Sequence, residues 1–426
     1  MLTYVIGAGV TGLAFANAFG DKAEVLEGSN DLGGKARSYK VETDVGTFGF
    51  DIGGHWFHHR SAPEVLQLLQ GLALGRHTRY AYVYKDRRFF DFPIQQSYKS
   101  HPDQKFVKTV EKELREIKKG NYLYTHYNDM LLKSYGVTLY NYFFLDYNAK
   151  MFGIRNLSKI NIGKYEKVRN VRADKGISGY NSDFLYPEGD IGAKGIPLFL
   201  AQKAKIRFNA KVRSIDLHKK TIVVNKEIIP WETIISTIPL TSLVKIISDI
   251  HPEIFRLSRK LKSSKGMIIN LGIKENPLHS NKSWVYMPSL EFHFHRVGFY
   301  SNVNPRLAPK GYSSIYVECS PLFFRSQKEA LDLVPKVVEE LIQIGFIANK
   351  KEVVTSDIIY LDQCYCFPDL QTTSLIRQYL EGFGVFSIGR YGTWHWSSQH
   401  EDMQQAVDLA NRFKIDNIKV LDFAEV

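Results

Sequence analysis

The chain has 426 residues, a hydrophobic content of 44% and a formal net charge of +12 at pH 7. This length and composition predict two or three folded domains and exclude a disordered or repetitive protein. The basic residues are spread along the chain and no DNA- or RNA-binding motif accompanies them. The charge therefore favours an anionic small-molecule ligand and no nucleic-acid partner.

Two features concern compartment and metal binding. No run of eighteen or more apolar residues occurs, and a glycine motif begins so close to Met1 that we expect no cleavable presequence before it. We therefore predict a cytoplasmic protein without stable membrane insertion. Cys319, Cys364 and Cys366 are too few for a disulfide framework, and one Cys-x-Cys lacks the second ligand pair of a zinc site. No metal site is expected.

The N-terminal segment has the pattern of a strand, a tight turn, a helix and a second strand. The strand-like segments 3–6 and 23–27 flank a helical stretch, and Gly7-x-Gly9-x-x-Gly12 stands between the first strand and the helix. The first glycine permits the turn, the second lets the backbone approach a pyrophosphate, and the third lets the helix pack on the strand. We assign a dinucleotide to Gly7, Gly9, Val10, Thr11 and Gly12.

An acidic residue supports this assignment. Glu27 follows Gly7 by twenty residues, at the end of the second strand, where its carboxylate can accept hydrogen bonds from a ribose. A negative charge there disfavours the 2′-phosphate of NADP. A glycine triplet alone is also compatible with a tight helix–sheet turn that binds nothing, but here strand, turn, helix and acid agree.

Later elements follow from apolar spacing. Residues 104–119 and 127–135 have helical spacing, which predicts a helical insertion. From about residue 205, alternating runs predict strands, and amphipathic stretches predict helices. The expected strands are 206–208, 212–217, 221–224, 234–239, 266–272, 283–287, 292–300, 313–318 and 384–389, and the expected helices are 242–250, 328–344 and 402–413.

A second glycine segment indicates which dinucleotide is bound. In Asp31-Leu-Gly33-Gly34-Lys-Ala-Arg37-Ser38 two glycines again allow backbone to approach phosphates, and Arg37 can lie beside them. This stretch resembles the second fingerprint of the amine oxidase and protoporphyrinogen oxidase superfamily of FAD proteins. The resemblance implies FAD in preference to NAD.

A third segment narrows the resemblance. Phe50-Asp51-Ile-Gly53-Gly54-His55 is similar to the segment that UDP-galactopyranose mutases carry beside the flavin. The resemblance implies that Gly53 and Gly54 allow backbone movement near the flavin ring and that His55 contacts it. A hydrogen-bonded structural histidine is the alternative for His55.

Further segments resemble the substrate-binding segments of the same mutases. Tyr147-Asn148-Ala-Lys-Met-Phe152 is similar to a segment whose asparagine contacts the substrate phosphate, and Arg296 follows Tyr286 at the separation of a tyrosine and a diphosphate-binding arginine. The resemblance implies that substrate contacts Asn148, Phe152, Trp284, Tyr286, Tyr365, Trp396 and Tyr82. These aromatic residues could equally belong to the core.

The sequence departs from the mutases at two of these positions. Where they have a second diphosphate-binding arginine, the spacing points to Lys167, which keeps the charge but loses the bidentate geometry. Trp396 stands where they have a tyrosine, which points to a related nucleotide sugar as the substrate. A surface salt bridge is the alternative role for Arg296 and Lys167.

The C-terminal part resembles the last flavin motif of the family. Gly389-Arg390-Tyr-Gly-Thr-Trp-His-Trp396 precedes a helix expected to begin near Asp402, whose N–H groups can face the flavin N1–O2 edge. The resemblance assigns five more residues to the cofactor. They are Gly389, Arg390, Asp402 and Met403 of this part and Val212 of the earlier strand meander.

The predicted fold class is α/β, with a Rossmann-like FAD-binding domain of the type that carries this double-glycine fingerprint. We expect that domain to comprise residues 1–75, 190–250 and 375–426. The helical insertion is predicted over residues 100–182, and a mixed or antiparallel substrate-binding sheet over residues 76–99 and 251–374.

The resemblance implies a flavoenzyme that interconverts the pyranose and furanose forms of a nucleotide sugar, as in cell-surface polysaccharide synthesis. Reduced FAD would act through N5 as a nucleophile at the anomeric carbon, with Arg296, Lys167 and His55 as catalytic residues. NAD(P)H or another reductant and a homo-oligomer are possible partners. The alternatives are an FAD-dependent oxidoreductase of the same superfamily and a non-catalytic protein that retains FAD structurally.

Overall fold

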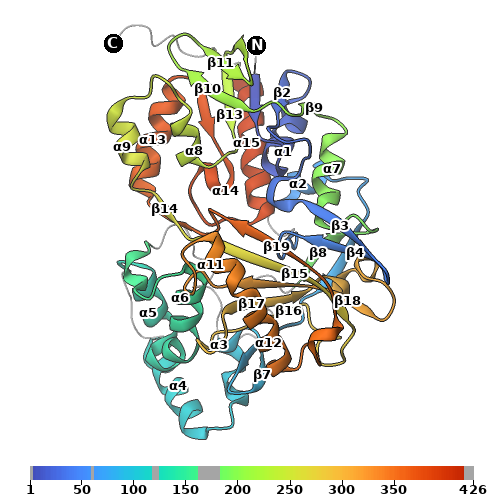
Figure 1. Cartoon of the computed structure of the whole chain (residues 1–426). Coiled ribbons are helices and arrows are strands. Elements are labelled where there is room, and N and C mark those ends of the chain that lie inside the picture. Colours follow the sequence, from blue (N-terminus) through green and yellow to red (C-terminus); the bar gives the residue numbers. More distant parts are fainter. Residues whose placement is uncertain (1–2, 59–61, 118–123, 162–182, 417–426) are drawn as a thin grey trace.

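The computed structural model describes residues 3–58, 62–117, 124–161 and 183–416, and Figure 1 shows the arrangement of its elements. Two large sheets organise the chain. One has five strands in the order β21-β13-β1-β2-β9, and the other has seven in the order β19-β15-β18-β17-β16-β6-β7. The predicted α/β class, with a Rossmann-like sheet and a separate mixed sheet, is confirmed.

The five-stranded sheet is entirely parallel. Its strands are β21 (Val385–Ser387), β13 (Thr233–Ser236), β1 (Thr3–Ile6), β2 (Ala23–Leu26) and β9 (Lys205–Arg207). Segments far apart in sequence thus meet in one sheet, as predicted. The helices α1 (Val10–Phe19), α7 (Gly195–Ala201) and α15 (Gln399–Asp416) pack beside it and against one another.

An antiparallel meander adjoins this sheet, formed by β10 (Val212–Asp216), β11 (Thr221–Val224) and β12 (Glu227–Pro230). The expected helix 242–250 is shorter, as α8 (Leu240–Lys245), and the chain continues into α9 (Pro252–Ser258). The C-terminal helices α13 (Leu370–Gly382) and α14 (Gly389–Gly392) flank the last strand.

The seven-stranded sheet is mixed, because β16 pairs in parallel with β6 while the other pairs are antiparallel. One face packs in a hydrophobic core with α12 (Val334–Ile344). The predicted helix 328–344 is divided into α11 (Gln327–Asp332) and α12. The strands are β19 (Val353–Leu361), β15 (Gly266–Lys274), β18 (Tyr312–Cys319), β17 (Phe294–Phe299), β16 (Trp284–Tyr286), β6 (Ala81–Lys85) and β7 (Arg88–Asp91).

The helical insertion lies beside this mixed sheet, at the lower left of Figure 1, and comprises α4 (Gln104–Ile117), α5 (Tyr127–Leu139), a π-helical turn (Tyr140–Phe144) and α6 (Leu145–Phe152). Gly136 interrupts α5 with φ +80°, and the Glu113 carboxylate accepts hydrogen bonds from the Thr138 main-chain N–H and hydroxyl just after the break. The π-turn shifts the side-chain register immediately before Tyr147 and Asn148.

The smaller elements join these parts. They are the hairpin β3 (Ser38–Thr43) and β4 (Gly46–Asp51), the pair β5 (Leu74–Thr78) and β8 (Asp183–Pro187), the pair β14 (Lys262–Ser263) and β20 (Cys366–Phe367), and the helices α2 (Pro63–Leu68), α3 (Ile94–Ser97) and α10 (Tyr300–Val303). Within the described ranges, no helix has the length and apolar character needed to cross a membrane. The division into three domains stays a prediction.

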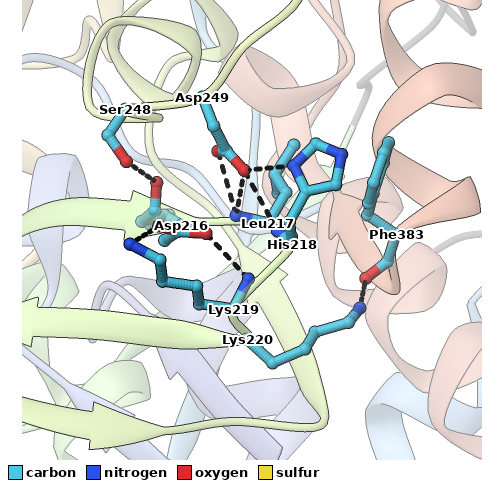
Figure 2. A network of polar contacts seen from close by, with 9 residues as sticks. Asp216, Leu217, His218, Lys219, Lys220, Ser248, Asp249 and Phe383 are labelled. Carbon is cyan, nitrogen blue, oxygen red and sulfur yellow. Dashed lines mark hydrogen bonds and ion pairs between the residues drawn. The ribbon is translucent and has the colours of Figure 1, made fainter.

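A polar network fastens the meander to the helices beside it (Figure 2). The Asp249 carboxylate accepts hydrogen bonds from the main-chain N–H groups of Leu217 and His218, both at 3.0 Å, and lies 2.6 Å from His218 Nδ1. The Lys220 ammonium contacts the main-chain oxygen of Phe383 at the end of α13. Burial would raise the pKa of Asp249, but these hydrogen bonds outweigh burial and lower the pKa to about 2.

We expect Asp249→Asn to lower the melting temperature at pH 7, corresponding to about 1–2 kcal/mol of unfolding free energy. Because the folded-state pKa lies below the ordinary value of 3.8, the carboxylate stabilises the fold above that value. Its contribution is lost as the pH falls from about 4 towards about 2. Melting curves of both proteins should therefore converge over that range, and a difference that stays constant with pH would refute this role.

Candidate active site

The glycine loop after β1 leaves open space at the start of α1. Gly7 has φ +102°, and a Cβ atom on Gly12 would lie 2.1 Å from the Gly7 carbonyl oxygen. A Cβ on Gly9 would meet no heavy atom within 4 Å. The first N–H groups of α1, from Val10 and Thr11 onward, therefore border a space that can accept a pyrophosphate.

Two other predicted glycine segments meet this loop. Gly33 and Gly34 both have left-handed backbone, and the Gly33 N–H donates to the Ala8 carbonyl at 2.8 Å. Gly389, with φ +77°, lies so close to α1 that a Cβ atom on it would be 3.0 Å from Thr11 Oγ1. Three of the segments predicted to hold FAD thus converge at the start of α1, which fits the cofactor's extended diphosphate.

Glu27 is fixed at the end of β2. One carboxylate oxygen accepts from the Ala8 N–H at 2.9 Å, and the other accepts from the Ser29 N–H and hydroxyl. The remaining lone pairs can accept from a ribose hydroxyl. Val212 is buried in the meander core, and the Arg37 side chain is exposed.

The Gly53-Gly54-His55 segment is anchored by buried polar groups. The Asp51 carboxyl accepts hydrogen bonds from Ser38 and Tyr186, and burial raises its pKa to about 6. The Gly53 N–H donates to the Tyr300 hydroxyl at 3.1 Å. His55 Nε2 lies 2.9 Å from the Ile52 carbonyl oxygen, so it must carry the proton. Burial lowers the His55 pKa to about 4, and the ring is neutral at pH 7.

A cavity of about 370 Å³ brings most of the predicted residues together. It lies between the Gly53–His55 segment, the α5–α6 helices, the β16–β17 strands and the segment after Arg390. A larger surface groove, about 420 Å³ between α13 and α15, contains none of them, so size alone does not locate the site. The predicted residues lining the cavity are Gly54, His55, Asn148, Phe152, Trp284, Tyr286, Arg296, Tyr365, Arg390 and Trp396.

A smaller cavity of about 130 Å³ shares five of these lining residues and continues the space toward Lys35 and Glu318. The predicted residues that line both cavities are Gly54, His55, Arg296, Tyr365 and Arg390. Gly54, His55 and Arg390 belong to segments predicted to contact the flavin, so the two cavities meet beside the expected position of the flavin ring.

Arg296 forms an ion pair with Glu318, a residue that the sequence analysis did not select. Its Nη2 lies 2.5 Å from Glu318 Oε1, and His295 Nε2 lies 3.1 Å from the other carboxylate oxygen. Burial opposes ionisation of Glu318, but Arg296 and His295 outweigh it and lower the Glu318 pKa to about 2. Arg296 Nε has no hydrogen-bond partner among the described residues, so the guanidinium keeps a donor for a ligand.

Three guanidinium groups line the cavity of about 370 Å³. Besides Arg296 they are Arg390, whose Nε also has no partner in the described part of the chain, and Arg79, which is 7% exposed and donates to the Phe92 carbonyl at 3.3 Å. No aspartate or glutamate stands among the described lining residues. Glu318, just outside the cavity, offsets the charge of Arg296, and the guanidinium groups still outnumber the carboxylates around the cavity, which suits an anion. Lys167 lies outside the described residues.

Aromatic side chains form the walls. Phe152 stacks on Trp396 with ring centroids 5.2 Å apart, and the Trp396 indole donates to the Cys366 carbonyl. Tyr147 meets Tyr286 edge-on at 5.4 Å. Asn148 donates to the Phe144 carbonyl and accepts from the Tyr127 hydroxyl, so only its second amide hydrogen is left for a phosphate.

Two expectations differ from the structure. Tyr82 does not line this cavity, because it stands opposite Val285 in register and shares that residue's face of the sheet, against Lys282 and Phe89. The last helix begins at Gln399, not near Asp402. Asp402 lies in its first turn, accepts from the Ser397 hydroxyl at 2.6 Å and has a pKa raised to about 7 by burial.

Met403, on the same helix as Asp402, is buried in the core that includes α1, so it holds α15 in place through packing.

The sequence analysis did not select Arg79, Gln95 or Glu318, which the structure places at or beside the cavity. Nothing in their immediate sequence marks them. Only the sheet pairing brings Glu318 opposite Arg296.

A profile of the family described as flavin containing amine oxidoreductase matches residues 10–321. The chain belongs to the flavin-containing amine oxidoreductase family. Membership implies FAD, in agreement with the three glycine segments around α1. A search of curated proteins finds no matching sequence.

Solved structures of related fold cover almost the whole chain. Reduced UDP-galactopyranose mutase superposes with a TM-score of 0.84 at 21% identity, over 99% of this chain and 97% of that one. An oxidoreductase from Methanosarcina mazei gives 0.68 at 17% identity, over 97% and 100%. A fatty acid isomerase from P. acnes that produces CLA gives 0.64 at 15% identity, over 96% and 98%. These likenesses establish the fold of the family.

Proposed function

We propose that this flavoprotein interconverts the pyranose and furanose forms of a nucleoside diphosphate sugar, with the flavin in its reduced state. The observation that carries the proposal is the cavity beside the flavin segments, which is lined by Arg79, Arg296 and Arg390 and by no carboxylate among the described lining residues, while Glu318 pairs with Arg296 from behind the cavity wall. A nucleoside diphosphate supplies the compensating negative charge. The similarity to a structure named as a reduced UDP-galactopyranose mutase supports the same reading.

Arg296 and Arg79 would bind the diphosphate, with Asn148 as a neutral donor to a phosphate oxygen. Negative charge on the diphosphate increases as the bond to the sugar breaks, so fixed cations stabilise the transition state more than the bound substrate. Lys167 remains our candidate for a further cation. A lysine can supply charge there, but not the paired hydrogen bonds of an arginine.

When bound and reduced, FAD supplies a nucleophilic N5 for the anomeric carbon and ends the reaction in the state in which it began. The chain's own part is to bind, orient and exclude water. Phe152, Tyr286, Tyr365 and Trp396 would enclose the sugar and nucleoside, and the neutral His55 ring would pack near the flavin without adding charge. The helix that begins at Gln399 would direct its first N–H groups toward the flavin.

The second candidate function is oxidation of an amine or another reduced substrate by hydride transfer to FAD. The family description favours it, because the matched profile is that of amine oxidoreductases. The excess of guanidinium groups over carboxylates around the cavity disfavours it, since that excess of positive charge would repel a protonated amine. Reduction of the flavin by amines without oxygen, followed by release of hydrogen peroxide in air, would select this alternative.

The proposal predicts activity only after reduction. Holoenzyme reduced by dithionite should convert one member of a panel of UDP-, GDP- and dTDP-sugars to its ring isomer, resolved by chromatography, whereas oxidised enzyme should convert none. Reductant should not be consumed in proportion to product, because the flavin is regenerated in each cycle. Stoichiometric consumption, or no conversion of any sugar in the panel, would reject the mutase assignment.

The remaining expectations stay predictions. They are NAD(P)H as a reductant, a homo-oligomer, a cytoplasmic location and a role in cell-surface polysaccharide synthesis.

A further inference from the structure

Lys150 is a buried lysine that the proposed reaction does not use, and burial lowers its pKa to about 7. Its side chain is 0% exposed, and its ammonium group donates to the main-chain oxygens of Met287 and Ser289, both at 2.7 Å. A buried ammonium group without hydrogen-bond partners is strongly unfavourable, so these two bonds are needed to keep it in place.

The two accepting carbonyls lie in the turn that joins β16 to β17. Tyr286 immediately precedes Met287, and Arg296 stands opposite Tyr286 in the strand register. Both Tyr286 and Arg296 line the larger cavity. The turn bound by Lys150 therefore fixes one wall of the cavity.

Lys150 itself belongs to the opposite wall. On α6 it lies two residues after Asn148 and two residues before Phe152, and both of these line the cavity. One turn earlier, Tyr147 packs edge-on against Tyr286. An aromatic contact and an ammonium contact thus join α6 to the hairpin at two successive points.

We propose that Lys150 is a positioning residue, which holds α6 and the β16–β17 hairpin at the separation needed for both walls to contact one nucleoside diphosphate. This inference rests on the proposed function. Methionine has a similar length but no donor, so Lys150→Met leaves two buried carbonyls without their partner. Such a loss is unfavourable and is relieved if the walls move apart.

The test compares UDP binding to flavin-loaded variants by calorimetry. Lys150→Met should keep its flavin and bind UDP about tenfold more weakly. Lys282→Met is the matched control, because Lys282 is also a poorly exposed lysine of this region, but its ammonium lies against Tyr82 and Phe89 on the other face of the sheet. It should bind UDP as the unmodified protein does.

A double-variant cycle separates positioning from general destabilisation. If Lys150 acts through Tyr286, the effect of Lys150→Met should largely disappear in a Tyr286→Ala background. Unchanged UDP affinity in Lys150→Met, or an equal loss in both backgrounds, would overturn the inference. If Lys150→Met loses flavin, Lys150→Gln takes its place in the same cycle. Loss of flavin by both variants would show that Lys150 is needed for folding, and would also overturn the inference. Failure of the unmodified holoenzyme to bind any nucleoside diphosphate would instead reject the proposed function, and the inference with it.

Discussion

Replacing Arg296 by alanine is expected to lower kcat/KM for the nucleotide sugar by about two orders of magnitude, the scale of losing one preorganised electrostatic contact. The guanidinium is partly exposed to the cavity beside the flavin segments, and its Nε has no hydrogen-bond partner among the described residues. Arg296→Lys should recover only part of the loss, because an ammonium group cannot form the paired hydrogen bonds. Steady-state kinetics on reduced, flavin-loaded protein measures the effect.

Glu318 supplies the control for this prediction. In Arg296→Ala the Glu318 carboxylate stays buried with only His295 beside it, and its charge would repel a diphosphate. The double variant Arg296→Ala, Glu318→Gln removes that charge. If Arg296 binds the substrate, activity stays low in the double variant, whereas recovery of activity would show that Arg296 serves only to neutralise Glu318.

In an Arg296→Ala, Lys167→Ala double variant the losses of kcat/KM should be non-additive, since both cations are proposed to bind one diphosphate.

Gly9→Val is expected to give folded protein that purifies without its yellow flavin and has no activity. Gly9 has φ −78° and ψ 173°, which valine adopts readily, and a Cβ atom there meets nothing within 4 Å. The added side chain therefore projects into the space that a pyrophosphate needs. The measurement is flavin absorbance per protein, together with a melting curve.

Gly12→Val distinguishes this effect from general damage to the loop. A Cβ atom at Gly12 would lie 2.1 Å from the Gly7 carbonyl oxygen and 3.1 Å from Val5 Cγ1, so this variant should fail to fold. A Gly9→Val protein that keeps its flavin, or one that binds NAD instead, would remove the glycine loop from the FAD site.

Local signals in the sequence predicted much of the fold and of the site. The glycine spacing identified the loop before α1, because turn geometry and close backbone approach depend on neighbouring residues. The resemblance linked Tyr286 and Arg296 by their ten-residue separation, and the structure pairs the two residues across β16 and β17. The β-rich stretches at 266–272 and 313–318 also located β15 and β18.

Features set by contacts distant in sequence were missed. The Arg296–Glu318 ion pair depends on the register of β17 with β18, and the Lys150 contact depends on how α6 packs against a turn more than a hundred residues later. The family resemblance implied that Tyr82 contacts the substrate, but successive side chains of a strand point to opposite faces of the sheet, and Tyr82 lies on the face away from the cavity. Edge strand β19 was missed because its apolar residues do not alternate.

The measurement that tests the central claim most directly follows the bond between the sugar and the diphosphate. A nucleotide sugar carrying ¹⁸O in the bridge between the anomeric carbon and the β-phosphorus is incubated with reduced holoenzyme, and the recovered substrate is examined by ³¹P NMR. If the diphosphate leaves and returns, as we propose, the label should spread from the bridging position to the non-bridging β-phosphate oxygens, at a rate comparable with ring isomerisation. Label that stays in the bridge while the sugar is isomerised or oxidised would show that this bond never breaks, and would contradict the proposed function.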